Sequence, residues 1–110
     1  MMTYNISLTE QASLDLLQIM EYFTAKVNLT FAEKKLVEIE NMIKSLSFQP
    51  TRGHKPHELY KINAAKQLEI IADKVRIIYE IKGNDIFVTA IFDSRQNVKA
   101  HLLKRMQKLH

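Results

Sequence analysis

The first part of the chain alternates a short strand pattern with helical spacing. Tyr4, Ile6 and Leu8 alternate with polar or small neighbours, which predicts a short, half-buried strand. Thr9 then stands where a helix cap is expected. The helix that follows has an apolar stripe at spacings of three and four residues, made by Ala12, Leu16, Ile19, Phe23 and Val27. This amphipathic helix is expected to pack on a sheet.

A second amphipathic helix follows after a very short connection. The run Thr30-Phe-Ala-Glu33 has the spacing of a capping box, in which the Thr and Glu side chains accept hydrogen bonds from free amides at a helix start. The apolar stripe of this helix is Ala32, Leu36, Ile39, Ile43 and Leu46. Because the connection has only two or three residues, we expect an antiparallel helical hairpin.

Helical periodicity stops after Leu46. The run from Phe48 to Leu59 holds both prolines, one of the two glycines and two of the four histidines, and it predicts a loop that continues to Ala65. Long ordered loops in small domains often carry function. An equally good explanation is that this loop carries the chain from the helical hairpin across to the next strand.

The remainder of the chain predicts a strand meander and a final helix. The strands are expected at 66–71, 75–82 and 85–92, and Gly83 and Asn84 between the last two favour a tight hairpin. An amphipathic helix is expected from Gln96 to the end. The predicted fold is therefore α+β: an N-terminal strand, an α-helical hairpin, a three-stranded antiparallel meander that completes a four-stranded sheet, and a C-terminal helix. Residues 1–110 are expected to form a single domain.

Arg76 lies inside a strand of otherwise apolar and β-branched residues. Because side chains alternate between the faces of a strand, Arg76 is expected on the face away from the helices. If that face is buried, the arginine needs a partner, and Glu69 and Glu80 are near enough to supply an ion pair. If the face is open, Arg76 and Arg95, which follows the last strand, are able to converge on a phosphate or a carboxylate.

The composition narrows the classes of site and compartment. The 110 residues contain no cysteine, which excludes disulfides and thiolate metal sites and fits a reducing compartment. The four histidines are poorly spaced for zinc, so we expect no metal and no cofactor. We find neither an apolar run long enough to cross a membrane nor a secretory signal pattern, so we expect a soluble cytoplasmic protein.

The charge is divided unevenly along the chain. The net charge is +4, but residues 1–47 carry a net charge of −2 and residues 48–110 a net charge of +6. We therefore expect a negatively charged partner or a nucleic acid at the basic residues of the second half. The alternative is a solvated helix face, where cations near a helix C-terminus also favour the helix dipole. The candidate binding residues are Arg52, Lys55, Lys61, Lys99, Lys104 and Arg105.

Four local patterns occur in order along the second half of the chain. They are Pro50-Thr-Arg-Gly-His-Lys-Pro-His-Glu-Leu59, Leu68-Glu-Ile70, Val75-Arg-Ile-Ile-Tyr-Glu-Ile81 and Ile91-Phe-Asp-Ser-Arg95. Together with the order of the predicted elements, they resemble the RelE/ParE superfamily of type II toxin–antitoxin toxins. The resemblance spans nearly the whole chain and implies a cognate antitoxin, expected to be a small acidic protein that forms a hetero-oligomer with the toxin and folds on binding.

One branch of this superfamily consists of ribosome-dependent mRNA endonucleases. The resemblance implies that Arg76 and Arg95 would stabilise the phosphate in the transition state, and that His101 would move a proton. Glu58 or Glu69 is the alternative base. His101 is also explained as an ordinary histidine on a helix surface. As a departure from the pattern, Gln67 and Glu69 stand where the best-known endonucleases have lysines.

The ParE branch resembles the same scaffold without the nuclease site and acts by trapping DNA gyrase. The missing lysines and the long helical hairpin favour this branch. We therefore expect a growth-inhibiting toxin that binds gyrase, with an mRNA interferase acting on ribosome-bound mRNA as the alternative. The second alternative is a non-toxic binding module, because a fold alone does not fix function.

Overall fold

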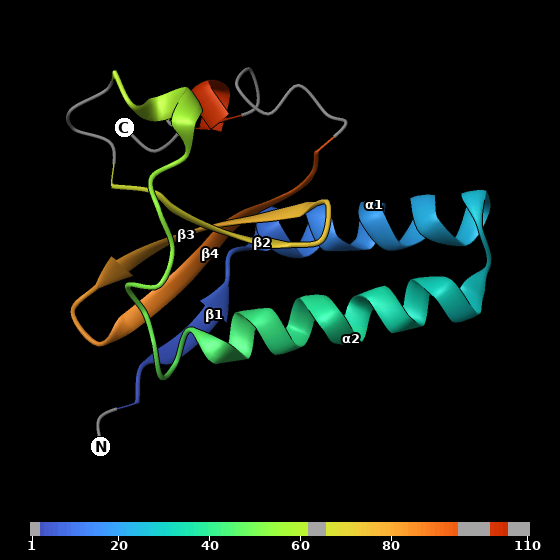
Figure 1. Cartoon of the computed structure of the whole chain (residues 1–110), viewed down its shortest axis with the longest axis horizontal. Helices are drawn as coiled ribbons and strands as arrows, with labels where there is room; N and C mark the ends of the chain where they lie inside the picture. Colours follow the sequence, from blue (N-terminus) through green and yellow to red (C-terminus); the bar gives the residue numbers. More distant parts are fainter. Residues whose placement is uncertain (1–2, 62–65, 95–101, 106–110) are drawn as a thin grey trace.

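The computed structural model describes residues 3–61, 66–94 and 102–105, and it confirms the predicted α+β fold (Figure 1). The first three elements are strand β1 (Asn5–Leu8) and helices α1 (Glu10–Lys26) and α2 (Leu29–Ser45). The loop after α2 contains the short 3-10 helix η1 (His57–Leu59). The meander then consists of β2 (Leu68–Ala72), β3 (Val75–Lys82) and β4 (Asp85–Asp93). Residues 102–105 are helical, and the other residues of the predicted C-terminal helix lie outside the described part.

The four strands form one mixed sheet in the order β1-β4-β3-β2. The meander β2-β3-β4 is antiparallel, whereas β1 runs parallel to β4 with Ile6 beside Ile86. The α1–α2 hairpin covers one face of the sheet and continues well past its end (Figure 1). The helical hairpin therefore leaves the other face of the sheet uncovered. The loop and η1 lie on that face.

The helix starts show one confirmed cap and one correction. Thr9 caps α1 as predicted, and its hydroxyl accepts a hydrogen bond from the amide of Ala12 at 3.1 Å. The prediction that Thr30 begins the second helix was wrong. Asn28 caps α2 instead, and its side chain accepts from the amide of Phe31 at 2.8 Å. Asparagine in an extended conformation directly after a tight connection is a strong cap, so the helix starts earlier and Thr30 falls within its first turn.

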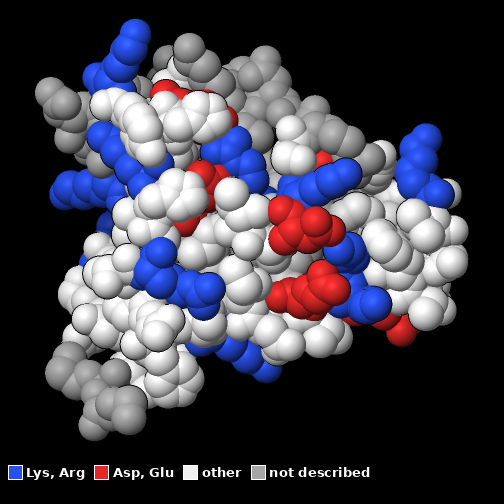
Figure 2. Space-filling model, in the orientation of Figure 1, with Lys and Arg blue, Asp and Glu red and all other residues white. Residues whose placement is uncertain are grey.

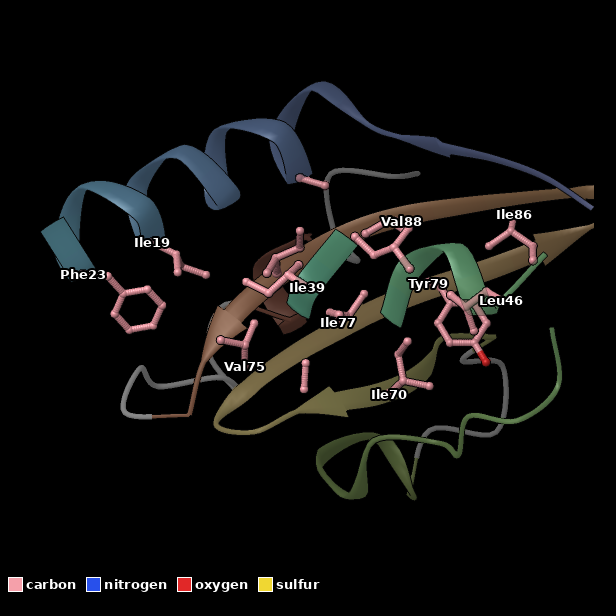
Figure 3. Close-up of a cluster of buried hydrophobic side chains, with 14 of the residues drawn as sticks. Ile19, Phe23, Ile39, Leu46, Ile70, Val75, Ile77, Tyr79, Ile86 and Val88 are labelled. Atoms are coloured by element: carbon pink, nitrogen blue, oxygen red, sulfur yellow. The ribbon is translucent and has the colours of Figure 1, made fainter. Parts of the chain in front are cut away.

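The main core lies between the helical hairpin and the sheet (Figure 3). Its side chains come from the predicted stripes of both helices and from alternate positions of the strands, as Ile19, Ile39, Ile77 and Val88 illustrate. Figure 3 also shows Phe23 beyond Val75 at one end of this core, and Tyr79 with its hydroxyl directed toward the loop side. Burial of these side chains is the main stabilising contribution on this face.

The opposite face of the sheet is also covered. Leu59 from η1 and Leu102 from the C-terminal helical segment pack against strand residues there, and together they form a second, smaller core of Leu59, Ile78, Ala90, Phe92 and Leu102. η1 and residues 102–105 accordingly lie side by side in Figure 1. Arg76 lies on the same face as Ile78 and is partly buried. A charged side chain in such a place needs a partner.

Candidate functional site

The loop between α2 and β2 is attached to the sheet at several points. Arg52 Nη1 donates to the hydroxyl of Ser45 at 2.7 Å. The buried Tyr79 hydroxyl donates to the carbonyl of Pro50 at 2.8 Å and accepts from the amide of Gly53 at 3.0 Å. Burial raises the pKa of the Tyr79 hydroxyl, which stays protonated and able to donate. A side chain at position 53 would place a carbon 2.4 Å from that hydroxyl oxygen, so this close approach requires glycine.

The same loop extends the outer edge of β2. The amide of His54 donates to the Glu69 carbonyl at 3.1 Å, and the amide of Glu69 donates to the His54 carbonyl at 2.7 Å. Three residues after His54, η1 begins and places Leu59 in the second core with no exposed surface. This path fixes Glu58 above β3, close to Arg76. The predicted loop is thus an ordered strap, which we call the 50–60 loop.

Arg76 is paired with two carboxylates at once. Its Nη1 and Nη2 donate to the two carboxylate oxygens of Glu58 at 2.6 and 2.7 Å, in a two-pronged pair. Its Nε donates to Oε1 of Glu69. The side chains of Arg76, Glu58 and Glu69 are 11%, 10% and 2% exposed, so all three charges are largely withdrawn from water. We refer to these residues as the arginine cluster.

The arginine cluster fixes the protonation states of its members. The hydrogen bonds from Arg76 hold the pKa of Glu58 at about 2, against the opposing effect of burial. The bonds to Glu58, and then to Glu69, raise the pKa of Arg76. Glu58 is therefore ionised at neutral pH, and the guanidinium fork is occupied by protein carboxylates. To bind a phosphate, Arg76 would have to leave two buried negative charges unpaired.

Two histidines of the 50–60 loop form the solvent side of the arginine cluster. His54 Nε2 lies 3.2 Å from Oε2 of Glu69, and His57 Nδ1 lies 3.5 Å from Oε1 of Glu58. Their side chains are 58% and 75% exposed. Our sequence-based reasoning did not single them out, although both stand within four residues of Glu58 in the loop, which was the available signal.

The structure places the predicted catalytic residues only in part. It brings Arg76, Glu58 and Glu69 together, whereas Arg95 and His101 lie outside the described residues. Gln67, next to the cluster in sequence, is 7% exposed, and its side-chain oxygen has no hydrogen-bond partner among the described residues. Within that same part of the chain, no group of three or more His, Asp or Glu side chains is arranged to hold a metal ion.

Arg105, one of the predicted partner-binding residues, forms an ion pair within the fold. Its Nη2 and Nη1 donate to the two carboxylate oxygens of Asp15 at 2.7 and 2.9 Å, and Nη1 also donates to the carbonyl of Thr89 at 3.0 Å. Asp15 in turn accepts from the amide of Ile91 at 3.0 Å. The guanidinium lies over the Phe92 ring, 5.2 Å from its centre. Arg105 therefore joins the C-terminal segment to α1 and β4.

The other predicted basic residues differ in how far they are exposed to solvent. Arg52, Lys61 and Lys104 are exposed and Lys55 is half-buried, while Lys99 lies outside the described residues. In Figure 2 blue side chains occur across the view; those at the left, where Figure 1 places the loop, have few red ones among them, whereas those at the right alternate with red ones. A basic surface is thus present on the side away from the tip of the helical hairpin. In the described part of the chain, we find no helix long and apolar enough to cross a membrane.

The family assignment follows from comparison with known sequences. Residues 6–98 match the family described as ParE toxin of the type II toxin–antitoxin system parDE. The chain belongs to this family. The match covers every strand and helix described above except Asn5 of β1 and residues 102–105, and it confirms the resemblance to the RelE/ParE superfamily. No curated protein sequence matches the chain.

Two solved structures share the fold at low sequence identity. A chromosomal ParDE toxin–antitoxin system from P. aeruginosa superposes with a TM-score of 0.69 at 16% identity, over 83% of this chain and 96% of the other. The RelBE2 toxin–antitoxin complex from Mycobacterium tuberculosis superposes with a TM-score of 0.56 at 19% identity, over 83% of this chain and 98% of the other. At these identities the likeness concerns the fold and not the chemistry.

Proposed function

We propose that this chain is a toxin that binds DNA gyrase and inhibits growth, and that a cognate antitoxin neutralises it in the cytoplasm by forming a hetero-oligomer. Membership of the ParE toxin family supports the toxin role. The two similar structures are both toxin–antitoxin systems, which supports an antitoxin partner. The choice of gyrase over RNA depends on the state of Arg76.

The observation that carries the proposal is the closed arginine cluster. A nuclease of the RelE type would need the Arg76 guanidinium free to contact a phosphate. Here Glu58 and Glu69 occupy it, and all three side chains are nearly buried. Two acids beside Arg76 neutralise its positive charge, so the cluster offers no free cation to a phosphate. An arginine used in this way holds a loop in place, which suits a toxin that acts by binding.

The contact surface proposed for gyrase is the helical hairpin together with the basic surface. Leu14 and Leu17 on α1 and Val37 on α2 are 47%, 55% and 55% exposed and supply apolar surface to the hairpin. Lys61 and Lys104 supply exposed positive charge. An apolar centre with a polar, charged rim is the usual anatomy of a protein-binding surface.

A supercoiling assay with purified gyrase and relaxed plasmid tests this proposal. We expect the purified chain to inhibit supercoiling at micromolar concentration and the cognate antitoxin to relieve the inhibition. The variant Leu17→Asp should weaken inhibition, because it places a charge in the apolar centre. The control Asn84→Asp, at an exposed position of the β3–β4 turn away from the helical hairpin, should leave inhibition unchanged. Unaltered supercoiling at micromolar toxin would contradict the proposal.

The alternative function is a ribosome-dependent mRNA interferase. The observation in its favour is that His54 and His57 lie exposed beside the carboxylates of the arginine cluster, where a proton carrier would be needed. In this alternative Arg76 and Arg95 hold the phosphate, and His101, Glu58 or Glu69 moves the proton. Translating ribosomes should then show mRNA cut in the A site. Toxicity that survives both Arg76→Ala and Arg95→Ala would rule it out.

A non-toxic binding module is the second alternative, and expression without the antitoxin separates it from both toxins. If the chain is a toxin, growth stops after induction and resumes when the neighbouring reading frame is expressed as well. If cells grow normally while folded protein accumulates, both toxin functions are wrong.

A further inference from the structure

A pocket of about 210 Å³ lies between the helical hairpin and the ends of the strands. At this end of the layer, α1 and α2 continue past the sheet (Figure 1). One wall comes from the helical hairpin and includes Tyr22, Lys26, Val27 and Phe31. The other wall comes from the strand ends and includes Lys74 and Val75. We call it the hairpin pocket. It is separate from the arginine cluster, which lies on the opposite face of the sheet.

The hairpin wall of the pocket is aromatic and fixed in shape. The Phe23 ring packs edge-on against Phe31, with ring centres 5.5 Å apart, and against Tyr22 at 5.9 Å. Next to these rings Val27 is 53% exposed and Leu29 is 60% exposed. In Figure 2 the end of the helical hairpin is largely white. A preformed apolar hollow beside an exposed apolar surface is typical of a protein-binding site.

Charged residues of both signs border this apolar surface: three lysines, and the acids Asp73 and Asp93, of which Asp93 is 9% exposed. Lys35 is held by Asp73 at 2.7 Å and by Glu38 at 3.2 Å, and these bonds, the one to Asp73 first, raise its pKa. Lys26 and Lys74 are exposed at the rim and come from opposite walls. The helix dipole favours a cation at the C-terminal end of α1, which is enough to explain a lysine at position 26. It does not explain a lysine at position 74, because Lys74 lies on the β2–β3 turn. The pair favours a ligand with negative charge on both sides of an apolar group.

We propose that the hairpin pocket receives one large apolar side chain of the cognate antitoxin, flanked by acidic residues that contact Lys26 and Lys74. The size supports a single side chain: cavities of roughly 150 Å³ hold benzene, whereas dedicated small-molecule sites have about 300–1,000 Å³. The proposal rests on the proposed function in one respect, that an antitoxin is the partner. It adds the place of contact and the chemistry of the contacting segment.

A peptide titration of the full chain, labelled with ¹⁵N, tests the pocket directly. The probes are the end-blocked peptides Asp-Glu-Phe-Glu-Asp and Asp-Glu-Ala-Glu-Asp. We expect the phenylalanine peptide to shift the amide signals of Val27, Phe31 and Lys74, and to bind at least about tenfold more tightly than the alanine peptide because the ring is buried. Equal binding of the two peptides, or shifts confined to other regions, would overturn the proposal.

Charge reversal provides the matched pair of variants. Lys26→Glu with Lys74→Glu should weaken binding of the phenylalanine peptide about tenfold, since each exposed ion pair contributes a factor of about two to five and reversal adds repulsion. Lys34→Glu with Lys44→Glu makes the same change in net charge at exposed positions of α2 outside the pocket, and should weaken binding less than about twofold. Circular dichroism confirms that both double variants are folded. Equal effects of the two double variants would contradict a local contact.

Competition with the whole antitoxin identifies the occupant. The product of the neighbouring reading frame, if it co-purifies with the chain, should displace the phenylalanine peptide at equimolar concentration. If that protein binds while the peptide stays bound, the antitoxin docks elsewhere and the proposal is wrong. These experiments contain no gyrase, so failure of gyrase inhibition and failure of the pocket are separate results.

Discussion

The two faces of the sheet are stabilised by different interactions. The face under the helical hairpin carries a continuous apolar core, in which Ile39, Ile77 and Val88 are almost fully buried. The opposite face combines a small apolar cluster with the buried charges of Arg76 and Glu69. The stability of an apolar core falls by degrees as its packing becomes less complete, whereas the stability of a buried ion pair depends on each partner being present. The second face is therefore the more specific and the more fragile of the two.

The largest expected effect is the loss of Arg76. Arg76→Ala leaves the nearly buried carboxylates of Glu58 and Glu69 without their arginine, beside only two exposed histidines, and should lower the free energy of unfolding by about 3–5 kcal/mol. Urea denaturation measures this loss in the free energy of unfolding. As the control, Arg76→Met combined with Glu58→Gln and Glu69→Gln removes all three charges together and should cost much less. If the single and triple variants are equally unstable, the cluster does not act as a set of coupled charges.

Substitution of two adjacent isoleucines compares the apolar packing of the two faces of the sheet directly. Ile77 belongs to the main core and Ile78 to the small one, and neither has exposed surface. Ile77→Ala should lower the free energy of unfolding by about 3–4 kcal/mol, and Ile78→Ala by about 2–3 kcal/mol, because the smaller cluster is better able to collapse around the cavity. Urea denaturation of both variants checks this order. A larger loss at Ile78 would mean that the second face is packed more rigidly than we propose.

Removal of Arg105 tests how the C-terminal segment is held over the second face. Arg105→Ala leaves the 6% exposed Asp15 with the Ile91 amide and a weaker contact to Gln11, and should cost about 2 kcal/mol. We expect amide hydrogen exchange to speed up at residues 102–105 and to stay slow in α2. Lys104→Ala, at an exposed neighbouring position, is the control. Equal exchange in both variants would show that apolar contacts through Leu102 hold the segment.

The smallest expected effect is the dependence of stability on pH. Because the pKa of Glu58 is lowered from 4.5 in the unfolded chain to about 2 in the folded one, its ion pair stabilises the fold above pH 4.5. That contribution is lost as the pH falls from 4.5 toward 2, and amounts to about 1–2 kcal/mol after solvent screening. Glu58→Gln should flatten this part of the stability profile. An equally steep profile in the variant would place the titration at another carboxylate.

Most of the fold was predictable because its signals are local. The spacing of Ile19 and Phe23, and the alternation around Ile77, reflect periods of the backbone itself, and the strand 75–82 was predicted with its observed bounds. The start of α2 was missed by two residues because two good caps, Asn28 and Thr30, stand close together. Propensity alone does not decide between neighbouring caps.

The candidate site was less predictable. The ion pair of Arg76 with Glu69 was one of the stated alternatives, but Glu58, which binds the two ends of the guanidinium, lies 18 residues away along an irregular loop. The hairpin pocket was missed altogether, because it joins Lys26 to Lys74 across the end of the sheet. Contacts of this kind depend on how a loop closes and how a hairpin extends past the strands, which local patterns do not encode.

The sequence by itself determined the elements, their order and the toxin family, since periodicity and local motifs act over a few residues. The tertiary structure alone decided which charges meet. It placed Glu58 and Glu69 on Arg76, and Asp15 on Arg105 across 90 residues of chain. The physical reason is that a partly buried charge is stable only beside a partner, and its partner is chosen by the folded path of the backbone.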